Sequence, residues 1–309
     1  MNVLDGPQSA LAPAGAEAHE IARTAWLLFG GGAAIFVLVM VLAAIAIVRR
    51  PSWLSGRSTV VVGGFVFPLV VLSALLVGSL SGSPRPFAST TRPDLVVEIV
   101  GEQWWWRVEY LDDRGQPDFA TANEIRVPVG AAVEVRLKSA DVLHSFWVPP
   151  LAGKLDMIPG RTNRLVFVAD EAGAWRGQCA EYCGSAHARM ALHLLAQPSA
   201  EFERWRDAQR SDAVPASEAH AEGRVLFEAN CAVCHAVRGT RALGERGPDL
   251  THLASRVSIG GGILPNDEAS IESWIASNQR LKPGNLMPEF RQFTPAELRA
   301  VTAYLAGLD

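Results

Sequence analysis

No cysteine in this chain lies outside two short segments, residues 179–183 and 231–235, which hold two cysteines each. Every thiol is therefore accounted for by two sites. No lysine or arginine precedes Arg23, whereas a secretory signal begins with a basic segment, so an exported N-terminus is expected instead of a signal peptide. The net charge of −4 at pH 7 is small and gives no indication of a nucleic-acid partner.

Charged residues are also absent from two long apolar runs, residues 25–48 and 60–80. A helix needs about 20 apolar residues to cross the hydrocarbon core of a bilayer, so each run is predicted to be a transmembrane helix. The alternative is a buried helix of a soluble protein, which two neighbouring runs of this length disfavour. The connection between them holds Arg49, Arg50 and Arg57 and no acid, which predicts that it lies on the cytoplasmic side. The N-terminus and the chain after the second run are then expected to face outward.

A β-rich region follows the apolar runs. Residues 132–138 alternate between apolar and polar side chains, which is the pattern of a half-buried strand. Further strands are expected at residues 95–100, 125–129 and 164–168. Short strands at this spacing are typical of a β-sandwich or barrel.

The rest of the chain is predicted to be helical. A charged helix is expected at residues 199–210, a helix carrying the second cysteine pair at 227–236, and a middle helix at 269–277. Residues 294–297 form the pattern of a capping box with proline at the first helical position, which opens a final helix. The expected organisation is, in chain order, an outward-facing tail at residues 1–24, a transmembrane hairpin at 25–80, a linker at 81–93, a β-domain at 94–198, a helix and linker at 199–217, and a C-terminal domain at 218–309.

The first cysteine segment and the residues just after it hold four potential metal ligands: Cys179, Cys183, His187 and Met190. Thiolate and imidazole together select copper or zinc over hard cations. A compact loop can turn these side chains toward one point, and His144, at the end of the clearest predicted strand, is the candidate ligand from elsewhere. Two thiolates can bridge two copper ions with one imidazole on each, and the Met190 thioether and the Glu181 carbonyl are expected as weak axial contacts.

Each of these residues has another interpretation when it is taken alone. Cys179 and Cys183 can form a disulfide, because an exported domain permits one. His187 can be a surface histidine, Met190 a core residue and His144 a structural histidine. A disulfide does not need histidine and methionine at these offsets, so the joint pattern favours copper.

The second cysteine segment reads C-x-x-C-H, with Cys231, Cys234 and His235. This motif attaches haem c through two thioethers, and its histidine becomes the proximal ligand of the iron. A thioredoxin-like dithiol and half of a zinc site are the alternatives. Residues 218–309 contain no second cysteine pair, and no βαβ pattern surrounds the motif, so both alternatives are disfavoured.

The sixth ligand of the haem iron is expected to be Met287, the only methionine of residues 218–309. Pro283 and Pro288 flank it and are expected to stiffen its loop. His252 is the rival, and ligation by two histidines would lower the reduction potential.

The first set of ligands resembles the binuclear CuA site of cytochrome c oxidase subunit II, in the residues His144, Cys179, Glu181, Cys183, His187 and Met190. Residues 101–106 and 154–161 resemble two further stretches of that family, and the similarity covers about residues 20–200. The resemblance implies a cupredoxin β-barrel. It implies that Trp104 is the aromatic contact through which electrons reach CuA in relatives without a fused haem, and that Glu181 helps to bind a magnesium ion shared with subunit I. Trp105, where the family more often has tyrosine, is expected in the core or at the membrane interface.

The C-terminal domain resembles a class I cytochrome c, which is an all-α fold. Residues 247–250 resemble the loop after the haem helix of that family, which implies that the Pro248 carbonyl orients His235. Residues 282–288 resemble its methionine loop. A cytochrome c fused behind a CuA domain is the arrangement of a caa-type haem–copper oxidase.

These resemblances imply a multidomain membrane protein that is the electron-entry subunit of a respiratory cytochrome c oxidase. Electrons would pass from a cytochrome c donor through haem c and CuA to haem a of subunit I, where oxygen is reduced and protons are pumped. Subunit III, membrane lipid and subunit I are the expected partners, in a bacterial inner membrane with both soluble domains on the periplasmic face. The oxygen-reducing centre is expected on another chain, because the remaining histidines are scattered and no set of them lies in the apolar runs: His19, His193, His220 and His252.

Three other functions share parts of this pattern. A copper chaperone of the Sco type has C-x3-C and a distant histidine, but it would have one span, a thioredoxin pattern and no haem motif. A quinol oxidase subunit II has the hairpin and barrel but lacks the copper ligands. An electron-transfer subunit of a nitrogen-oxide reductase can carry CuA and haem c, and the hairpin together with Glu181 favours the oxygen-reducing family over it.

Overall fold

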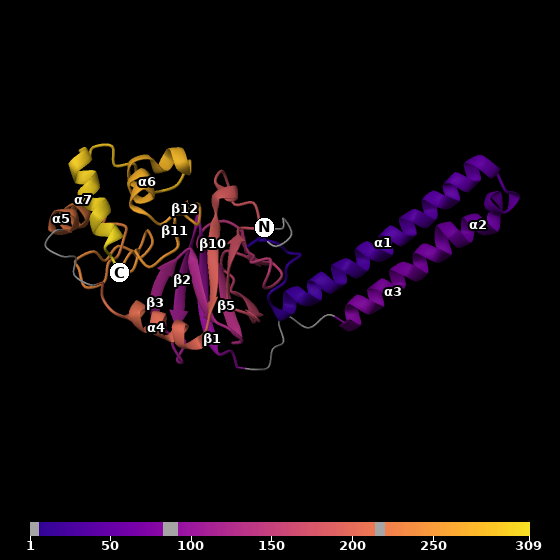
Figure 1. Cartoon of the computed structure of the whole chain (residues 1–309), viewed down its shortest axis with the longest axis horizontal. Helices are drawn as coiled ribbons and strands as arrows, with labels where there is room; N and C mark the ends of the chain where they lie inside the picture. The colour runs from indigo at the N-terminus through magenta and orange to yellow at the C-terminus, as the bar shows by residue number, and fades with distance from the viewer. Residues whose placement is uncertain (1–5, 83–91, 214–219) are drawn as a thin grey trace. The chain divides into compact units, whose positions relative to one another are not determined.

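The computed structural model describes residues 6–82, 92–213 and 220–309, and Figure 1 labels its elements. Most of the two predicted linkers falls outside the described residues. The chain divides into two compact units, one of residues 1–21 with 91–309 and the other of residues 22–90. Each unit is described by itself.

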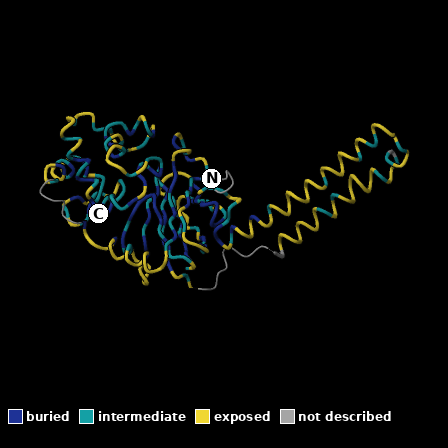
Figure 2. Tube along the Cα trace, viewed as in Figure 1, coloured by how far each residue is buried: buried dark blue, intermediate teal, exposed yellow. Residues whose placement is uncertain are grey.

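The smaller unit is a pair of apolar helical stretches. The first is α1 (Ala16–Arg49), whose residues 16–21 belong to the larger unit. A short 3₁₀ turn, η2 (Ser52–Ser55), leads to the second, which comprises α2 (Arg57–Val61), the π-helical turn η3 (Val62–Val66) and α3 (Phe67–Gly82). Both stretches are long and apolar enough to cross a membrane, and their side chains are largely exposed, as Figure 2 shows. The π-helical turn precedes Pro68. Proline has no N–H to donate to the preceding turn, and its ring clashes with the carbonyl four residues earlier, which disfavours a regular α-helix there.

The first helix begins earlier than predicted, because residues 16–24, expected in a tail, are helical. The segment just before it packs on the β-domain. Ala14 N donates to Pro150 O at 2.7 Å, and Asp170 N donates to Ala14 O at 2.9 Å. Ala14 is buried, as is Ala18 in the first turn of α1, so this part of the predicted tail belongs to a folded unit.

The β-domain contains two main sheets, with strand orders β3-β2-β1-β5-β8 and β4-β10-β9, and a small pair β6-β7. β1 runs parallel to β5 and antiparallel to β2, and β10 runs parallel to β4 and antiparallel to β9. The strands are β1 (Leu95–Glu102), β2 (Trp105–Leu111), β3 (Pro117–Ala122), β4 (Glu124–Pro128), β5 (Val133–Ser139), β6 (His144–Phe146), β7 (Leu155–Met157), β8 (Asn163–Phe167), β9 (Gly173–Gln178) and β10 (Ala191–Gln197).

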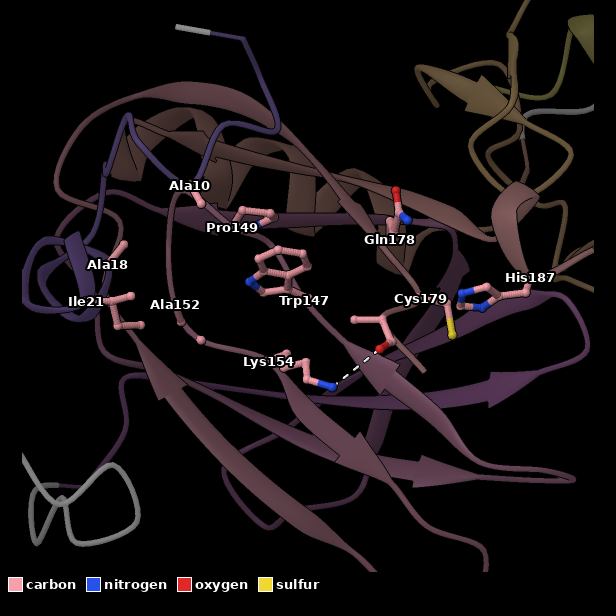
Figure 3. Close-up of a pocket in the computed structure, with 12 residues that line it drawn as sticks. Ala10, Ala18, Ile21, Trp147, Pro149, Ala152, Lys154, Gln178, Cys179 and His187 are labelled. Carbon is pink, nitrogen blue, oxygen red and sulfur yellow. Dashed lines mark hydrogen bonds between the residues drawn. The ribbon is translucent and has the colours of Figure 1, made fainter. Parts of the chain in front are cut away.

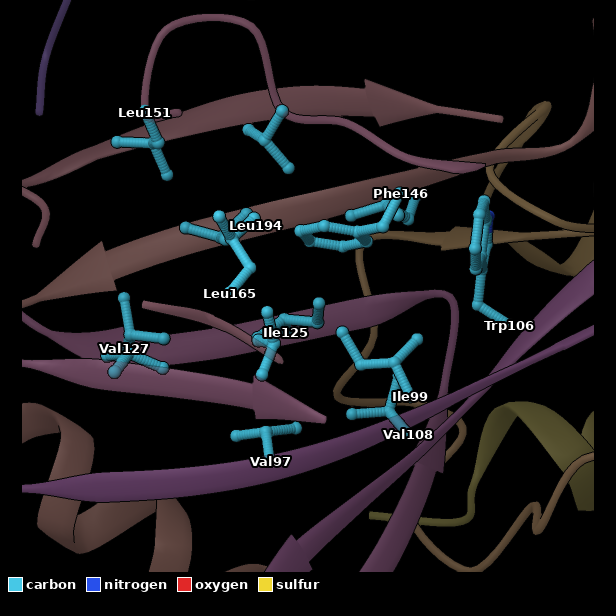
Figure 4. Close-up of a cluster of buried hydrophobic side chains, with 14 of the residues drawn as sticks. Val97, Ile99, Trp106, Val108, Ile125, Val127, Phe146, Leu151, Leu165 and Leu194 are labelled. Atoms are coloured by element: carbon cyan, nitrogen blue, oxygen red, sulfur yellow. The ribbon is translucent and has the colours of Figure 1, made fainter. Parts of the chain in front are cut away.

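The core of the β-domain lies between its two sheets. Buried and half-buried residues alternate along β1, because successive side chains of a strand point to opposite faces. Figure 4 shows Val97, Ile99 and Val108 from one sheet facing Ile125 and Leu194 from the other. Each such side chain contributes about 1.5–3 kcal/mol when it is fully buried. The predicted β-sandwich or barrel is confirmed.

After the β-domain comes α4 (Ser199–Arg210), which has the predicted bounds, and then the C-terminal domain with α5 (Ala221–Asn230), α6 (Glu268–Leu281) and α7 (Pro295–Ala306). A short β-hairpin, β11 (Ser258–Ile259) and β12 (Leu264–Pro265), lies between α5 and α6. Phe227 of α5 packs on Tyr304 of α7, with ring centroids 5.5 Å apart. The predicted capping box at the start of α7 is present.

The helix expected to carry the second cysteine pair ends earlier than predicted. α5 ends at Asn230, and both cysteines lie in the turn that follows it. Cys234 N and His235 N both donate to Cys231 O at 3.0 Å, which closes a tight turn. The prediction of a helix at residues 227–236 is therefore wrong in its second half.

Candidate metal centres

Five of the predicted copper ligands meet at one end of the β-domain. The sulfur atoms of Cys179 and Cys183 are 3.7 Å apart. His144 Nδ1 lies 3.8 Å from Cys179 Sγ, and His187 Nδ1 lies 3.5 Å from Cys183 Sγ. The Met190 sulfur lies 3.8 Å from Cys183 Sγ. His144 comes from β6, and the others come from the loop between β9 and β10.

His144 is fixed in a single orientation by its neighbour Asp141. His144 Nε2 lies 2.8 Å from Asp141 Oδ1, and the histidine side chain is fully buried. A carboxylate only accepts hydrogen bonds, so Nε2 carries a proton and Nδ1 is the ring nitrogen that faces Cys179. The second carboxylate oxygen of Asp141 accepts the Gln103 amide at 2.7 Å. One acid therefore holds both the histidine and the turn that precedes Trp104.

The two thiols near His144 share their protons unequally. The hydrogen bond with Cys183 lowers the pKa of Cys179, and the contacts with His144 and with backbone groups add to this effect. The same hydrogen bond raises the pKa of Cys183, and burial raises it further. A thiolate is the form of cysteine that binds metals, so Cys179 is prepared to be a ligand in the absence of any ion.

The backbone carbonyl and the side-chain carboxylate of Glu181 contact different groups. Its carbonyl oxygen lies 3.2 Å from Cys179 Sγ, where an axial contact was expected. Its carboxylate lies 3.8 Å from Lys154 Nζ. The lysine also donates to Ala180 O at 3.4 Å, as the dashed line in Figure 3 shows. The predicted magnesium ligand is thus paired with a lysine in this structure.

A cavity of about 600 Å³ opens beside these residues. Figure 3 shows Cys179 and His187 at one side of it, with Trp147 and Lys154 along its wall and Ile21 opposite. The cavity places two of the copper ligands close to a surface that is partly polar. A partner that covers this surface would come close to Cys179 and His187.

Trp104 lies in the turn between β1 and β2 and contacts the copper-ligand loop. Its indole Nε1 donates to Cys183 O at 2.9 Å, and the side chain is buried. Trp106 is fully buried in the core. Trp105 is half-buried with the Arg107 guanidinium over its ring, 5.0 Å from the centroid. Among the residues that the structure describes, Trp104 is the one of the three indoles that hydrogen-bonds to a residue of the ligand set.

The haem motif is organised around His235. Its Nδ1 donates to Pro248 O at 2.8 Å, which is the contact expected from the resemblance to cytochrome c. Because Nδ1 is the donor, Nε2 is free to bind iron. Burial lowers the pKa of His235, which favours the neutral ligand form. Burial raises the pKa of the Cys231 thiol to about 12, so it is held protonated, unlike Cys179.

Gly247 leaves the space in which the His235 ring lies. A Cβ atom at this position would be 2.6 Å from Cε1 and 2.9 Å from Nδ1 of His235. Such contacts are far shorter than van der Waals distance, so a side chain here would displace the ring. The sequence reasoning singled out the segment but not this role of the glycine.

Met287 and His252 lie in different surroundings. Met287 is half-buried and packs on the core of the C-terminal domain. His252 is buried, and its Nε2 lies 3.1 Å from Ser211 O, so that nitrogen is engaged by the backbone. The geometry therefore gives no support to His252 as a sixth ligand, and Met287 remains the expected one.

The donor sets fit the groups for which they were predicted. Two thiols, two imidazoles and a thioether in one cluster, buried except for the half-buried His187, are the nitrogen and sulfur ligands that copper prefers. Hard cations such as calcium and magnesium prefer oxygen ligands, which this cluster lacks apart from the Glu181 carbonyl. In the C-terminal domain, both thiols precede a neutral histidine whose orientation is fixed, as covalent haem requires.

Comparisons with known proteins identify both domains. A family model described as the periplasmic domain of cytochrome c oxidase subunit II matches residues 115–196, and a cytochrome c model matches residues 220–309. Cytochrome c oxidase subunit 2 of Alkalihalophilus pseudofirmus is 35% identical over 265 residues, which cover 84% of this chain and 75% of the relative. The Bacillus subtilis subunit 2 is 32% identical over 228 residues, which cover 69% of this chain and 62% of the relative. The crystal structure of the periplasmic domain of CoxB of Bradyrhizobium japonicum is 32% identical, covers 39% of this chain and 96% of that chain, and has a TM-score of 0.36.

The first family model matches residues of the β-domain, and the second matches residues of the C-terminal domain. The β-domain is therefore a cupredoxin-like copper domain, and the C-terminal domain is a cytochrome c domain. Identity and coverage with the Alkalihalophilus relative extend beyond either domain alone. The chain belongs to the cytochrome c oxidase subunit II family, in the form that carries a fused cytochrome c domain.

Proposed function

We propose that this chain collects electrons from a cytochrome c donor and passes them through haem c and a binuclear CuA centre to haem a of subunit I. Subunit I would reduce oxygen to water and couple the reaction to proton pumping. When bound, covalent haem and a thiolate-bridged copper pair each take up and release single electrons. The role of this chain is to hold both groups, to tune them and to place them close to each other.

One observation carries the proposal: the two sulfur atoms of Cys179 and Cys183 lie 3.7 Å apart with one imidazole nitrogen within 4 Å of each. Two thiols at this separation can each contact two metal ions. His144 lies beside Cys179, and His187 lies beside Cys183. This arrangement supports a centre of two metal ions in preference to a single ion bound by both cysteines and both histidines.

The remaining partners follow from the same proposal. We place both soluble domains on the periplasmic side of a bacterial inner membrane, because the arginine-rich connection between the two apolar stretches favours the cytoplasmic side. Subunit I would cover the cavity beside Cys179 and His187, and subunit III would complete the complex. Magnesium binding by Glu181 at the subunit I interface would require its carboxylate to leave Lys154.

An electron-transfer subunit of a nitrogen-oxide reductase is the remaining competitor with the same two cofactors. Three relatives that match most of this chain, from Alkalihalophilus pseudofirmus, Bacillus sp. PS3 and Bacillus subtilis, are named cytochrome c oxidase subunit 2, which supports the oxygen-reducing function. A copper chaperone is disfavoured because the fold that surrounds the cysteines is a β-sandwich and the chain carries a haem motif.

Copper content and electron paramagnetic resonance of the purified full chain test the proposal. We expect two copper ions per chain that share one unpaired electron. The Cys183→Ser variant should lose this signal while its haem c spectrum stays unchanged. One copper per chain, or none with Cys179 and Cys183 joined as a disulfide, would contradict the relay and favour a metal carrier.

A further inference from the structure

The C-terminal domain is joined to the β-domain by contacts that use backbone groups. Arginine side chains of the β-domain donate to three carbonyl oxygens of the C-terminal domain: Arg107 to Glu245 at 2.8 Å, Arg126 to Ser255 at 2.8 Å and Arg189 to Leu281 at 2.5 Å. The buried carboxylate of Glu124 accepts the Val257 amide at 2.7 Å. Bonds to the backbone specify the position of a chain segment, so these contacts define one docked arrangement.

A turn of three consecutive glycines lies at the centre of this contact. Gly260, Gly261 and Gly262 all have positive φ angles, of 66°, 80° and 75°, which residues with a side chain rarely adopt. The Ala191 amide, next to the copper ligand Met190, donates to Gly261 O at 2.9 Å. A Cβ atom on Gly261 would lie 3.0 Å from Trp104 O. Only glycine therefore lets this turn approach the backbone beside the copper site.

Lys282 inserts its ammonium group between the turn and Trp104. Its Nζ donates to Trp104 O at 2.5 Å and to Gly260 O at 2.8 Å. The side chain is 2% exposed, and no carboxylate of the described residues forms an ion pair with it. A buried charge is costly unless its hydrogen bonds are satisfied. Burial lowers the pKa of Lys282 to about 7. The two carbonyl oxygens satisfy hydrogen bonds of the buried amine.

The methionine loop of the C-terminal domain then covers the Trp104 ring. A Cβ atom on Gly284 would be 3.3 Å from the Trp104 ring, so the loop backbone passes close to the indole. On its other side the indole bonds to Cys183 O. Trp104 is only 7% exposed as a consequence. It lies between the loop that holds the expected haem ligand and the loop that holds the copper ligands.

We propose that Lys282 and the Gly260–Gly262 turn form a clamp that holds the cytochrome c domain against Trp104 of the copper domain. Lys282 is thus a positioning residue for electron transfer within the chain. The purpose of the clamp rests on the relay proposed above, whereas its existence does not. An electron that crosses this contact leaves ferric haem and a copper pair reduced by one electron, and no bond is made or broken.

Cleavage between the domains of the assembled oxidase tests the clamp without any use of its activity. A protease site placed within residues 214–219 separates the chain after α4, and the release of haem absorbance from the copper-containing part is followed by gel filtration. We expect slow release from the otherwise unchanged protein and release about tenfold faster or more from Lys282→Met, because a buried donor with two acceptors is removed. The contacts of residues 209–213 with the C-terminal domain are the same in both proteins.

Two matched controls accompany this variant. Lys138→Met removes the same charge from a lysine whose partner is Glu98, within the β-domain, and should release haem at the original rate. Gly261→Ala should act like Lys282→Met, because its Cβ atom would lie 2.2 Å from Lys282 Nζ. Gly130→Ala has nearly the same φ, 77°, and open space around it, so it controls for backbone strain. Equal release from Lys282→Met and Lys138→Met, or immediate release from the unchanged protein, would overturn the proposal.

A second measurement distinguishes a change in the position of the cytochrome c domain from a loss of the copper or haem centre. Flash photoreduction of haem c measures the rate at which electrons reach copper, and we expect this rate to fall about tenfold in Lys282→Met. The copper resonance and the haem spectrum should be unchanged, because Lys282 is not one of the predicted ligands. Trp104→Phe keeps the backbone carbonyl and should keep the slow release. An unchanged rate in Lys282→Met would overturn the positioning role, whereas a missing copper signal in the unchanged protein would count against the relay and leave the release assay informative.

Discussion

Asp141 holds His144 by a 2.8 Å hydrogen bond from the histidine Nε2 to the carboxylate Oδ1. Asp141 lies in the loop before β6, three residues ahead of His144, which is the first residue of that strand. This contact decides which ring nitrogen faces Cys179. It also joins the ligand to the turn of Trp104, because the other carboxylate oxygen accepts the Gln103 amide.

Replacing Asp141 by asparagine should weaken copper binding by about 10–100-fold, the range seen when a partner of a metal-binding histidine is removed. The neutral amide is a poorer acceptor for Nε2–H and leaves the imidazole less basic. Competition with a copper chelator measures the affinity. Asp112→Asn is a control, since Asp112 also accepts backbone amides, from Arg114 and Gln116, in a loop of the same domain. Equal affinities in the two variants would show that Asp141 does not support the ligand.

Met190→Leu should keep copper but change its reduction potential and slow the relay. Met190 is 1% exposed, and leucine fills a similar volume, so the structural cost is expected to be below about 1.5 kcal/mol. The thioether, however, is lost as a weak ligand. Redox titration of the copper resonance measures the potential, with Met157→Leu as a control for the same change in the core. An axial role would be wrong if potential and rate stayed at their original values.

Gly247→Ala should displace the His235 ring and destabilise the cytochrome c domain by about 1–3 kcal/mol, the usual cost of added volume in a packed site. The added Cβ would lie 2.6 Å from the ring, and the bond to Pro248 O would be strained or lost. The haem absorption spectrum and a denaturant titration followed at the haem report both effects. Gly6→Ala, where no atom lies within 4 Å of the added carbon, is the control. A haem spectrum and stability like those of the control would contradict this role of Gly247.

Local patterns in the sequence predicted local structure well. The charged helix at residues 199–210 and the capping box at Thr294 were predicted with the bounds and contacts that the structure has. The copper ligands Cys179 to Met190 are close in sequence, so their meeting could be expected from spacing alone. The helix at residues 227–236 was wrong because the turn at Cys231 is stabilised by hydrogen bonds that leave no pattern in the residue types.

Contacts between distant segments could not be predicted in this way. Lys282 and Trp104 are 178 residues apart, and the lysine bonds to a backbone carbonyl that every residue type possesses. The three glycines at 260–262 are visible in the sequence, but what approaches them depends on how two domains dock. Asp141 lies near His144 in sequence, yet only the fold shows that the same carboxylate reaches Gln103.

The stability of the β-domain should depend on pH through Glu134. Burial raises the pKa of this carboxyl, but the hydrogen bonds from Arg164 and Arg136 outweigh burial, and the net pKa is lowered. A lowered carboxyl pKa means that the folded state binds fewer protons than the unfolded state. The stabilisation is therefore complete above the ordinary pKa of 4.5 and is lost as the pH falls through the lower pKa of the folded state.

Glu134→Gln should cost about 1–2 kcal/mol at pH 7, because two charge-assisted hydrogen bonds become neutral ones, while the exposure of Arg164 limits their strength. This difference should shrink as the pH falls below 4.5, because the original side chain then also becomes neutral. Urea unfolding of the metal-free protein with reduced thiols, followed by near-ultraviolet circular dichroism at several pH values, measures it. Asp113→Asn, at an exposed loop position, should show little difference at any pH. A constant difference between Glu134→Gln and the original protein from pH 7 to pH 3 would show that the loss comes from changed packing and not from the carboxylate charge.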